Sequence, residues 1–172
     1  MLDEIAENYA TGKIHIPWDK FEYVEDDPDH FTWAGFLKFA DEFVDSCKPF
    51  VNQGESIFVI TDSTIDHNNW VDGTMTTAAS DHVAHLLRTR LNLTQARVDA
   101  ISGSGFVARA HEGLHFRNRI SSARGFDTIV VMGGWNDASR QKKTVRIAAH
   151  EFWNVLRDIS RGTLPRTRSL VS

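Results

Sequence analysis

The sequence predicts an α/β fold in which helices cover both faces of a parallel sheet. The apolar runs SIFVI at 56–60 and DTIVVM at 127–132 are typical of strands that are buried on both faces. Amphipathic helical segments separate the predicted strands, and strands that alternate with helices favour a parallel sheet. Ligands of such sheets bind beyond the carboxyl ends of the strands. We therefore expect the functional site in the loops that follow strands 56–60, 96–101 and 127–132.

Apolar periodicity predicts each element in chain order. Residues 2–10 are predicted to form a short helix that ends at Gly12, and KIHI at 13–16 alternates as a brief strand. A polar, aromatic loop is expected up to Asp29, and helical spacing then indicates a helix over 31–48 that a proline ends. The remaining predicted elements are strand 56–60, helix 77–91, strand 96–101, helix 114–123, strand 127–132, helix 145–159 and a last strand at 168–172.

Length and composition fit one compact domain over residues 1–172. A chain of 172 residues, 41% of them hydrophobic, is long enough to fold without a metal or a disulfide, because a domain of this size buries roughly 70% of its unfolded surface. The net charge of −4 and the lack of a lysine or arginine run argue against a general nucleic-acid binder. Cys47 is the single cysteine, which excludes an intrachain disulfide and favours a packing role late in a helix.

The first ten residues are acidic and helical in pattern, unlike the basic and then apolar start of a signal peptide. No uninterrupted apolar stretch approaches the roughly 18 residues that a membrane span needs. We therefore expect no signal peptide and no membrane span. The expectation is a protein made for the cytosol, one that joins a virion or another assembly, or one that leaves by a route this segment does not encode.

Four short motifs carry the side chains of a serine esterase. In chain order they are DPDH at 27–30, ITDST at 60–64, ISGSG at 101–105 and GGWND at 133–137. Ester hydrolysis needs a nucleophilic hydroxyl, a base for its proton, a group that orients the base, and hydrogen-bond donors for the oxyanion. The residues that fit these roles are Ser63 as nucleophile, His30 as base, Asp27 as its orienting partner, and Gly103 and Asn136 as oxyanion donors.

These motifs resemble the sequence blocks of the SGNH hydrolases, the GDSL-type esterases and lipases. ITDSTID is similar to the nucleophile block, with Thr61 where glycine usually stands, ISGSGF is similar to the glycine block, and GGWND to the asparagine block. DPDHFTWAGF resembles the D-x-x-H block through Asp27, His30, Thr32 and Gly35.

The resemblance implies a three-layer α/β/α sandwich with a parallel, flavodoxin-like sheet. It implies a triad of Ser63, His30 and Asp27, with an oxyanion hole formed by the backbone N–H groups of Ser63 and Gly103 and the side-chain amide of Asn136. It implies no metal and no organic cofactor. The substrate class that it suggests is a short acyl ester, with O-acetyl groups on carbohydrate as one example.

The order of the blocks differs from that of the family, in which the D-x-x-H block lies at the carboxyl end. A circular permutation explains the difference, because 168–172 followed by 1–16 would supply the strand, helix and strand that precede the histidine block. The original ends would then be joined through CKPFVNQGES at 47–56, a polar segment with proline and glycine.

Several residues near the motifs have competing interpretations. Gly105 competes with Gly103 as an oxyanion donor, and Gly103 is favoured because it comes first after the strand. Thr61 places a side chain beside the nucleophile turn, which motivates a catalytically silent carbohydrate-binding module of the same fold as an alternative. Asp62 is expected to be structural, and Asp137 is expected to cap the segment that follows it.

Aromatic and histidine residues supply further alternatives. Trp70 and Trp135 are candidates for the walls of a substrate pocket, with core packing as the other interpretation. HEGLH at 111–115 matches the H-E-x-x-H zinc-protease signature, so a zinc hydrolase built on its two histidines, His111 and His115, is a less favoured alternative. Its internal glycine weakens the helix that both histidines must share, and no third ligand is apparent. His82 and His85 are expected to form an exposed pair on a polar helix face.

Overall fold

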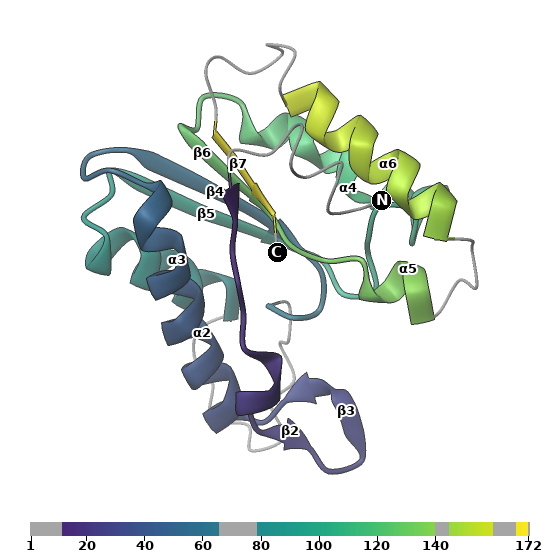
Figure 1. Cartoon of the computed structure of the whole chain (residues 1–172), viewed down its shortest axis with the longest axis horizontal. Coiled ribbons are helices and arrows are strands. Elements are labelled where there is room, and N and C mark those ends of the chain that lie inside the picture. Colours follow the sequence, from purple (N-terminus) through teal and green to yellow (C-terminus); the bar gives the residue numbers. More distant parts are fainter. Residues whose placement is uncertain (1–11, 66–78, 140–144, 160–167, 172) are drawn as a thin grey trace.

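A five-stranded parallel sheet forms the centre of the molecule (Figure 1). The computed structural model describes residues 12–65, 79–139, 145–159 and 168–171. The sheet has the order β1-β7-β6-β4-β5, and every pairing in it is parallel. Its strands are β1 (Gly12–Lys13), β4 (Ser56–Thr61), β5 (Gln95–Ala100), β6 (Thr128–Val131) and β7 (Arg168–Val171). The predicted α/β class with a parallel sheet is confirmed.

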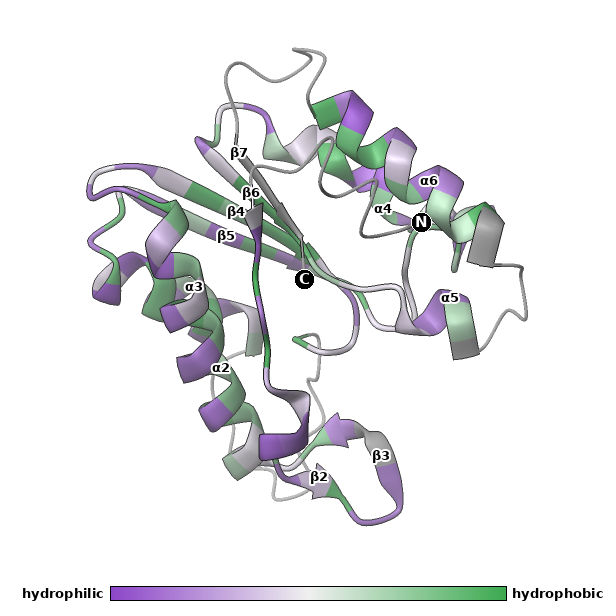
Figure 2. Cartoon of the chain, in the orientation of Figure 1, coloured by the Kyte–Doolittle hydropathy of each residue, from purple (hydrophilic) through white to green (hydrophobic). Residues whose placement is uncertain are grey.

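Helices cover both faces of this sheet and give the molecule three layers (Figure 1). One face carries α2 (Trp33–Cys47) and α3 (Ala79–Arg90), and the other carries α4 (Phe116–Arg119) and α6 (Val145–Asp158). Side chains of β4 alternate between two buried clusters: Ile57 and Val59 pack with α2 and α3, whereas Phe58 and Ile60 pack with α4 and α6. Figure 2 shows hydrophobic and hydrophilic residues alternating along α6, as expected for a helix with one buried face.

Helix α2 follows directly from the periodicity of its sequence. Its buried residues recur at helical spacing and are Gly35, Phe36, Phe39, Ala40, Phe43, Val44 and Cys47. The helix predicted over 31–48 occupies 33–47 and is followed by the short 3-10 helix η2 (Lys48–Phe50), which contains the proline. Cys47 packs as a small buried residue, and this burial raises the pKa of its thiol.

Most predicted elements are observed within two residues of their predicted boundaries: strands 56–60, 96–101, 127–132 and 168–172, and helices 31–48, 77–91, 114–123 and 145–159. The helix predicted at 114–123 is divided into α4 and the 3-10 helix η4 (Ile120–Ala123). The strand predicted at 13–16 pairs only through β1, although Ile14 and Ile16 are buried. The helix predicted at 2–10 and Trp70 lie outside the described residues.

The segment before α2 is a hairpin rather than the predicted loop. It contains the 3-10 helix η1 (Trp18–Lys20) and an antiparallel pair, β2 (Tyr23–Val24) and β3 (Asp27–Phe31). Sequence patterning missed it because these strands are short and lack the alternation that marks a half-buried strand. The ring of Phe31 anchors the hairpin, with its centroid 5.0 Å from that of Phe39 in α2 and 6.4 Å from that of Trp18.

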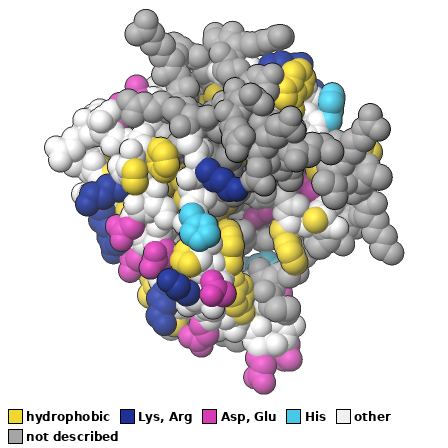
Figure 3. Space-filling view, in the orientation of Figure 1, with side chains coloured by type: hydrophobic (Ala, Val, Ile, Leu, Met, Phe, Trp, Pro, Cys, Tyr) yellow, Lys and Arg dark blue, Asp and Glu magenta, His cyan; other side chains and the backbone are white. Residues whose placement is uncertain are grey.

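The surface over α2 and α3 carries charges of both signs (Figure 3). Arg90 of α3 forms an ion pair with Asp41 of α2 at 2.7 Å, which joins the two helices across this surface. Among the residues that the structure describes, no helix has the length and apolar character needed to cross a bilayer.

Candidate active site

The loops after β4, β5 and β6 leave the sheet at one edge, because parallel strands place their carboxyl ends together (Figure 1). These three loops carry Ser63, Gly103 and Asn136 respectively. The segments predicted to supply the nucleophile and the oxyanion donors are therefore gathered at one edge of the sheet. The β2–β3 hairpin, which carries Asp27 and His30, lies beside the start of α2 in Figure 1.

Asp27 and His30 form a hydrogen-bonded pair. Oδ2 of Asp27 lies 2.7 Å from Nδ1 of His30. Residues three apart on a regular strand point to opposite faces, but here the register shifts so that the five residues of β3 face the two of β2. Because a carboxylate can only accept, Nδ1 is the donor in this hydrogen bond, and in a neutral imidazole Nε2 is then the acceptor. The neutral imidazole thus has the tautomer that a general base needs.

Thr32 and Gly35 attach this hairpin to the start of α2. The Thr32 N–H donates to the carbonyl oxygen of Glu22 at 3.0 Å, and its Oγ1 accepts from the Gly35 N–H at 3.0 Å as the helix cap. A Cβ at position 35 would overlap the Glu22 carbonyl oxygen, so the close approach of helix and hairpin requires glycine. The two residues that extend the resemblance beyond His30 therefore have a structural role: they hold the histidine segment in place.

Ser63 lies in the turn after β4 and is partly exposed. Asp62 supports this turn, because its Oδ1 accepts hydrogen bonds from the Thr64 N–H at 3.0 Å and the Thr64 hydroxyl at 2.8 Å. Ser63 and His30 both belong to the described part of the chain. The contact between the Ser63 hydroxyl and the His30 imidazole stays a prediction.

Thr61, two residues before Ser63, is fully buried. Its carbonyl oxygen accepts hydrogen bonds from the Ile101 N–H and from Arg119, both at 3.3 Å. Among the described residues, its hydroxyl has no hydrogen-bond partner. The side chain is thus part of the packed interior at the end of β4.

Asn136 links the glycine block to the nucleophile turn from the first turn of α5 (Trp135–Ser139). Its buried Nδ2 donates to the carbonyl oxygen of Ser104 at 3.0 Å and reaches Oδ2 of Asp62 at 3.4 Å. Burial raises the pKa of the Asp62 carboxyl, and the charge of Asp137 adds to this effect, whereas hydrogen bonds from Thr64 oppose it.

Asp137 does not cap the segment that follows it, so that prediction was wrong. Its buried carboxylate accepts hydrogen bonds from the backbone N–H groups of residues 106–108, at 2.8 to 2.9 Å. A Cβ at Gly105 would overlap this carboxylate, so the glycine is explained by packing. Gly103 instead has a φ of 73°, in the left-handed region that favours glycine. Gly103 stays the predicted oxyanion donor.

Replacing Gly105 by alanine is expected to lower the free energy of unfolding by roughly 2–3 kcal/mol. The Asp137 carboxylate cannot move aside without losing its backbone hydrogen bonds. Gly54→Ala is the control. Gly54 has a φ of 83° and open space where a Cβ would lie, so this variant bears only left-handed strain, which costs about 1–2 kcal/mol. Urea unfolding of both variants checks this, and a smaller loss for Gly105→Ala would contradict it.

Arg119 is a buried cation that the sequence analysis did not single out. It donates to the Asp99 carboxylate at 2.9 Å and to the Asp99 carbonyl oxygen at 2.6 Å. It also donates to the carbonyl oxygen of Thr61 at 3.3 Å, to Oγ of Ser104 at 2.9 Å and to the carbonyl oxygen of Leu114 at 3.3 Å. Arg119 therefore joins the ends of β4 and β5 to the glycine block. The sequence feature that could have indicated a buried cation was Asp99, a charged residue near the end of a predicted strand.

HEGLH does not form one helix. His111 lies in the 3-10 helix η3 (Ala110–Glu112), Gly113 ends that turn with a φ of 74°, and His115 precedes α4. The two imidazoles therefore lack the shared helix face that the zinc-protease signature requires. Within the described ranges, no group of three His, Cys, Asp or Glu residues lies close enough together to hold a metal ion.

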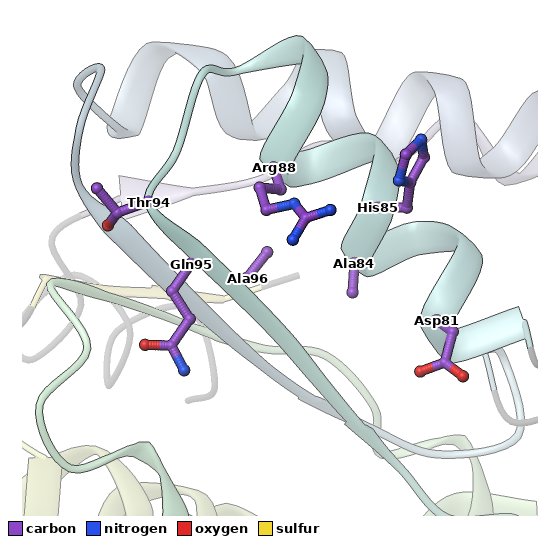
Figure 4. A pocket seen from close by; sticks show the side chains of 7 residues that line it. All are labelled: Asp81, Ala84, His85, Arg88, Thr94, Gln95 and Ala96. Atoms are coloured by element: carbon purple, nitrogen blue, oxygen red, sulfur yellow. The ribbon is translucent and has the colours of Figure 1, made fainter.

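His82 is not the exposed residue that was predicted. The centroid of its ring lies 6.0 Å from that of Trp33 and 6.2 Å from that of Phe36. Partial burial lowers the pKa of His82, and the nearby His85 adds to this effect. His85 lines a pocket of about 220 Å³ between α3 and β5 (Figure 4). None of the predicted site residues lines this pocket.

Trp135 has 61% of its surface exposed, which excludes core packing as its role. It directly precedes Asn136 at the start of α5, so an exposed indole borders the predicted oxyanion donor. A large exposed aromatic ring offers a flat apolar contact to a ligand. The suggestion that Trp135 forms a wall of a substrate pocket stays a prediction.

Comparison with known proteins adds little to this description. No protein-family model and no curated protein matches the sequence. A solved crystal structure is similar with a TM-score of 0.48 and 23% sequence identity, over 69% of this chain and 56% of that chain. This chain therefore spans little more than half the length of that protein, and the similarity is too low to support an argument.

Proposed function

We propose that the protein is a serine ester hydrolase with Ser63 as nucleophile, His30 as general base and Asp27 as the group that orients His30. The observation that carries this proposal is the 2.7 Å hydrogen bond between Asp27 and Nδ1 of His30. A carboxylate that fixes the protonated Nδ1 leaves Nε2 free of a proton and able to accept one.

The proposed reaction begins when Oγ of Ser63 attacks the ester carbonyl carbon and its proton passes to Nε2 of His30. Asp27 then stabilises the imidazolium. The tetrahedral oxyanion would accept hydrogen bonds from the Ser63 and Gly103 N–H groups and from Nδ2 of Asn136. His30 returns the proton to the leaving alcohol, and water attacks the acyl-enzyme by the same route in reverse.

The strand order supports a circularly permuted SGNH hydrolase fold. Numbered from β4, the strand before the nucleophile turn, the order β5-β4-β6-β7-β1 becomes 2-1-3-4-5, which is the flavodoxin-like arrangement. In this numbering β1 is the last strand of the sheet, and the histidine block follows it. The early position of His30 in the chain is therefore compatible with the topology that the resemblance implies.

As substrate we propose a short acyl ester, with an O-acetyl group on carbohydrate as the leading candidate. Trp135 supports this choice, since an exposed indole beside Asn136 can contact the apolar face of a sugar ring. The same exposed indole, together with the buried Thr61 side chain beside the nucleophile turn, favours a carbohydrate-binding module without catalysis as the second candidate.

Covalent labelling tests the proposal. A fluorophosphonate probe is expected to modify Ser63 stoichiometrically, because it phosphonylates an activated serine and mimics the tetrahedral intermediate. Peptide mass spectrometry identifies the labelled residue, and hydrolysis of 4-nitrophenyl acetate is measured in parallel, with and without a chelator. We expect labelling and turnover, both unaffected by the chelator. A folded protein with neither would favour the binding module, and loss on chelation would favour a metal-dependent reaction.

A further inference from the structure

We propose that Asp62 is a positioning residue that aligns the nucleophile turn and the oxyanion donor Asn136 with each other. This inference rests on the proposed function, because it assigns a role within the same site. Asp62 was expected to be structural, and its contacts give that role a specific purpose, because each carboxylate oxygen contacts a different part of the candidate site.

The two oxygens of Asp62 are occupied on opposite sides of the site. Oδ1 accepts from the N–H and the hydroxyl of Thr64, at 3.0 and 2.8 Å, which fixes the residue after Ser63. Oδ2 faces Nδ2 of Asn136 at 3.4 Å. Each of these three partners donates, so the side chain needs an acceptor oxygen at both positions. A carboxyl group has two oxygens that can accept, whereas an amide has a single acceptor oxygen.

The two hydrogens of the Asn136 amide are held with different strength. One is directed to the carbonyl oxygen of Ser104 at 3.0 Å, an ordinary hydrogen-bond distance. The other reaches Oδ2 of Asp62 at 3.4 Å, near the limit for a hydrogen bond. Ser104 is itself held by Arg119 and by the carbonyl oxygen of Ile101. We infer that the Ser104 contact is permanent and that the Asp62 contact is exchanged for the oxyanion.

The partners of Asp62 distinguish it from the equally buried Asp137, whose carboxylate, among the described residues, accepts only from backbone N–H groups. Asp62 is only 2% exposed, and burial raises its pKa, so the folded protein bears a cost for holding it ionised. Asp99 illustrates the usual solution, in which a partly buried carboxylate is paired with the guanidinium of Arg119. Asp62 is paired instead with the hydroxyl and amide groups of the candidate site. A carboxylate in that setting is best explained by the alignment of those groups.

A double-mutant cycle between Asp62 and Asn136 tests the proposal. Asn136→Ala is expected to lower kcat by roughly 10²–10³-fold, the usual effect of removing one oxyanion donor. Asp62→Asn places a side-chain amide against the Nδ2 donor of Asn136, which displaces Asn136. This is expected to lower kcat roughly 10-fold or more with little change in KM, because Asn136 acts only in the transition state. The double variant is expected to match Asn136→Ala, since Asp62 acts through Asn136.

Asp127→Asn is the matched control. Asp127 accepts hydrogen bonds from the N–H and the hydroxyl of Ser56 at 2.8 and 2.7 Å, at the opposite end of β4 from the candidate site. The kcat of the Asp127→Asn variant is expected to equal that of the wild type. Additive losses in the double variant, or a kcat for Asp62→Asn equal to wild type, would overturn the proposal. If the fluorophosphonate probe does not label Ser63 in the wild type, the proposed function is overturned instead. Failure of the Asp62 proposal and failure of the proposed function are therefore distinguishable.

A measurement on the unsubstituted protein covers the case in which Asp62→Asn does not fold. The phosphonyl adduct of Ser63 presents an oxyanion-like oxygen to the site. In NMR spectra, one side-chain N–H resonance of Asn136 is expected to shift strongly on adduct formation, while the other, bound to Ser104, moves little. Equal shifts of both resonances, or no shift of either, would contradict the exchange.

Discussion

Replacing Ser63 by alanine is expected to lower kcat for 4-nitrophenyl acetate by roughly 10⁵-fold or more, because alanine has no oxygen to attack the ester. His30→Ala is expected to cause a loss of similar size. Nucleophile and base act as a unit, so the double variant should be no less active than either single variant. Initial rates measured against a matched blank give these values, and circular dichroism shows whether each variant is folded.

Ser102→Ala provides the control for the nucleophile. Ser102 is an exposed serine in the glycine block at the same end of the sheet, and its hydroxyl has no role in the proposed reaction. Its substitution is expected to leave kcat within about twofold of wild type, as for a surface change away from the reacting groups. Activity retained in Ser63→Ala but lost in Ser102→Ala would assign the nucleophile to the glycine block.

Asp27→Asn extends the same experiment to the orienting carboxylate. Its expected loss in kcat is about 10⁴-fold, because an amide N–H can face Nδ1 and stabilise the wrong tautomer of His30. The hydrogen bond at 2.7 Å makes this pair the best defined part of the candidate triad. A loss below tenfold would mean that Asp27 does not set the protonation of the imidazole.

Apolar periodicity was sufficient to predict the sheet and its covering helices, because burial imposes a pattern that a single chain displays. Strand β4 and helix α2 lie within two residues of their predicted boundaries for this reason. The β2–β3 hairpin was missed because its stability comes from contacts distant in sequence, such as the packing of Phe31 against Phe39. Local pattern carries no information about a partner in another element.

The candidate site was predicted unevenly for the same reason. Motif resemblance identified Asp27 and His30, and the structure brings them into contact. The roles of Asp137 and Arg119 depend on partners many residues away in the chain, namely the loop 106–108 and the end of β5. No spacing rule connects these positions. Sequence reasoning therefore found the residues proposed to react, but not the buried groups that hold them.

Arg119→Met is expected to lower the free energy of unfolding by about 3–5 kcal/mol, because it leaves the Asp99 carboxylate without its cation. Arg119 is 8% exposed, and its substitution also removes donors from the carbonyl oxygens of Thr61 and Leu114. In a chain of 172 residues, this loss corresponds to a decrease in Tm of roughly 10 °C. Differential scanning calorimetry measures it directly.

Arg117→Met is the matched control, since Arg117 lies two residues earlier in α4 and its side chain is 40% exposed. Its ion pairs with Asp158 at 3.1 Å and Glu151 at 3.7 Å are solvated, so their loss is expected to cost less than about 1 kcal/mol. Adding Asp99→Asn to Arg119→Met should restore part of the lost stability, because the unpaired charge is then removed. Equal Tm values for the two arginine variants would show that the ends of β4 and β5 are held by apolar packing rather than by Arg119.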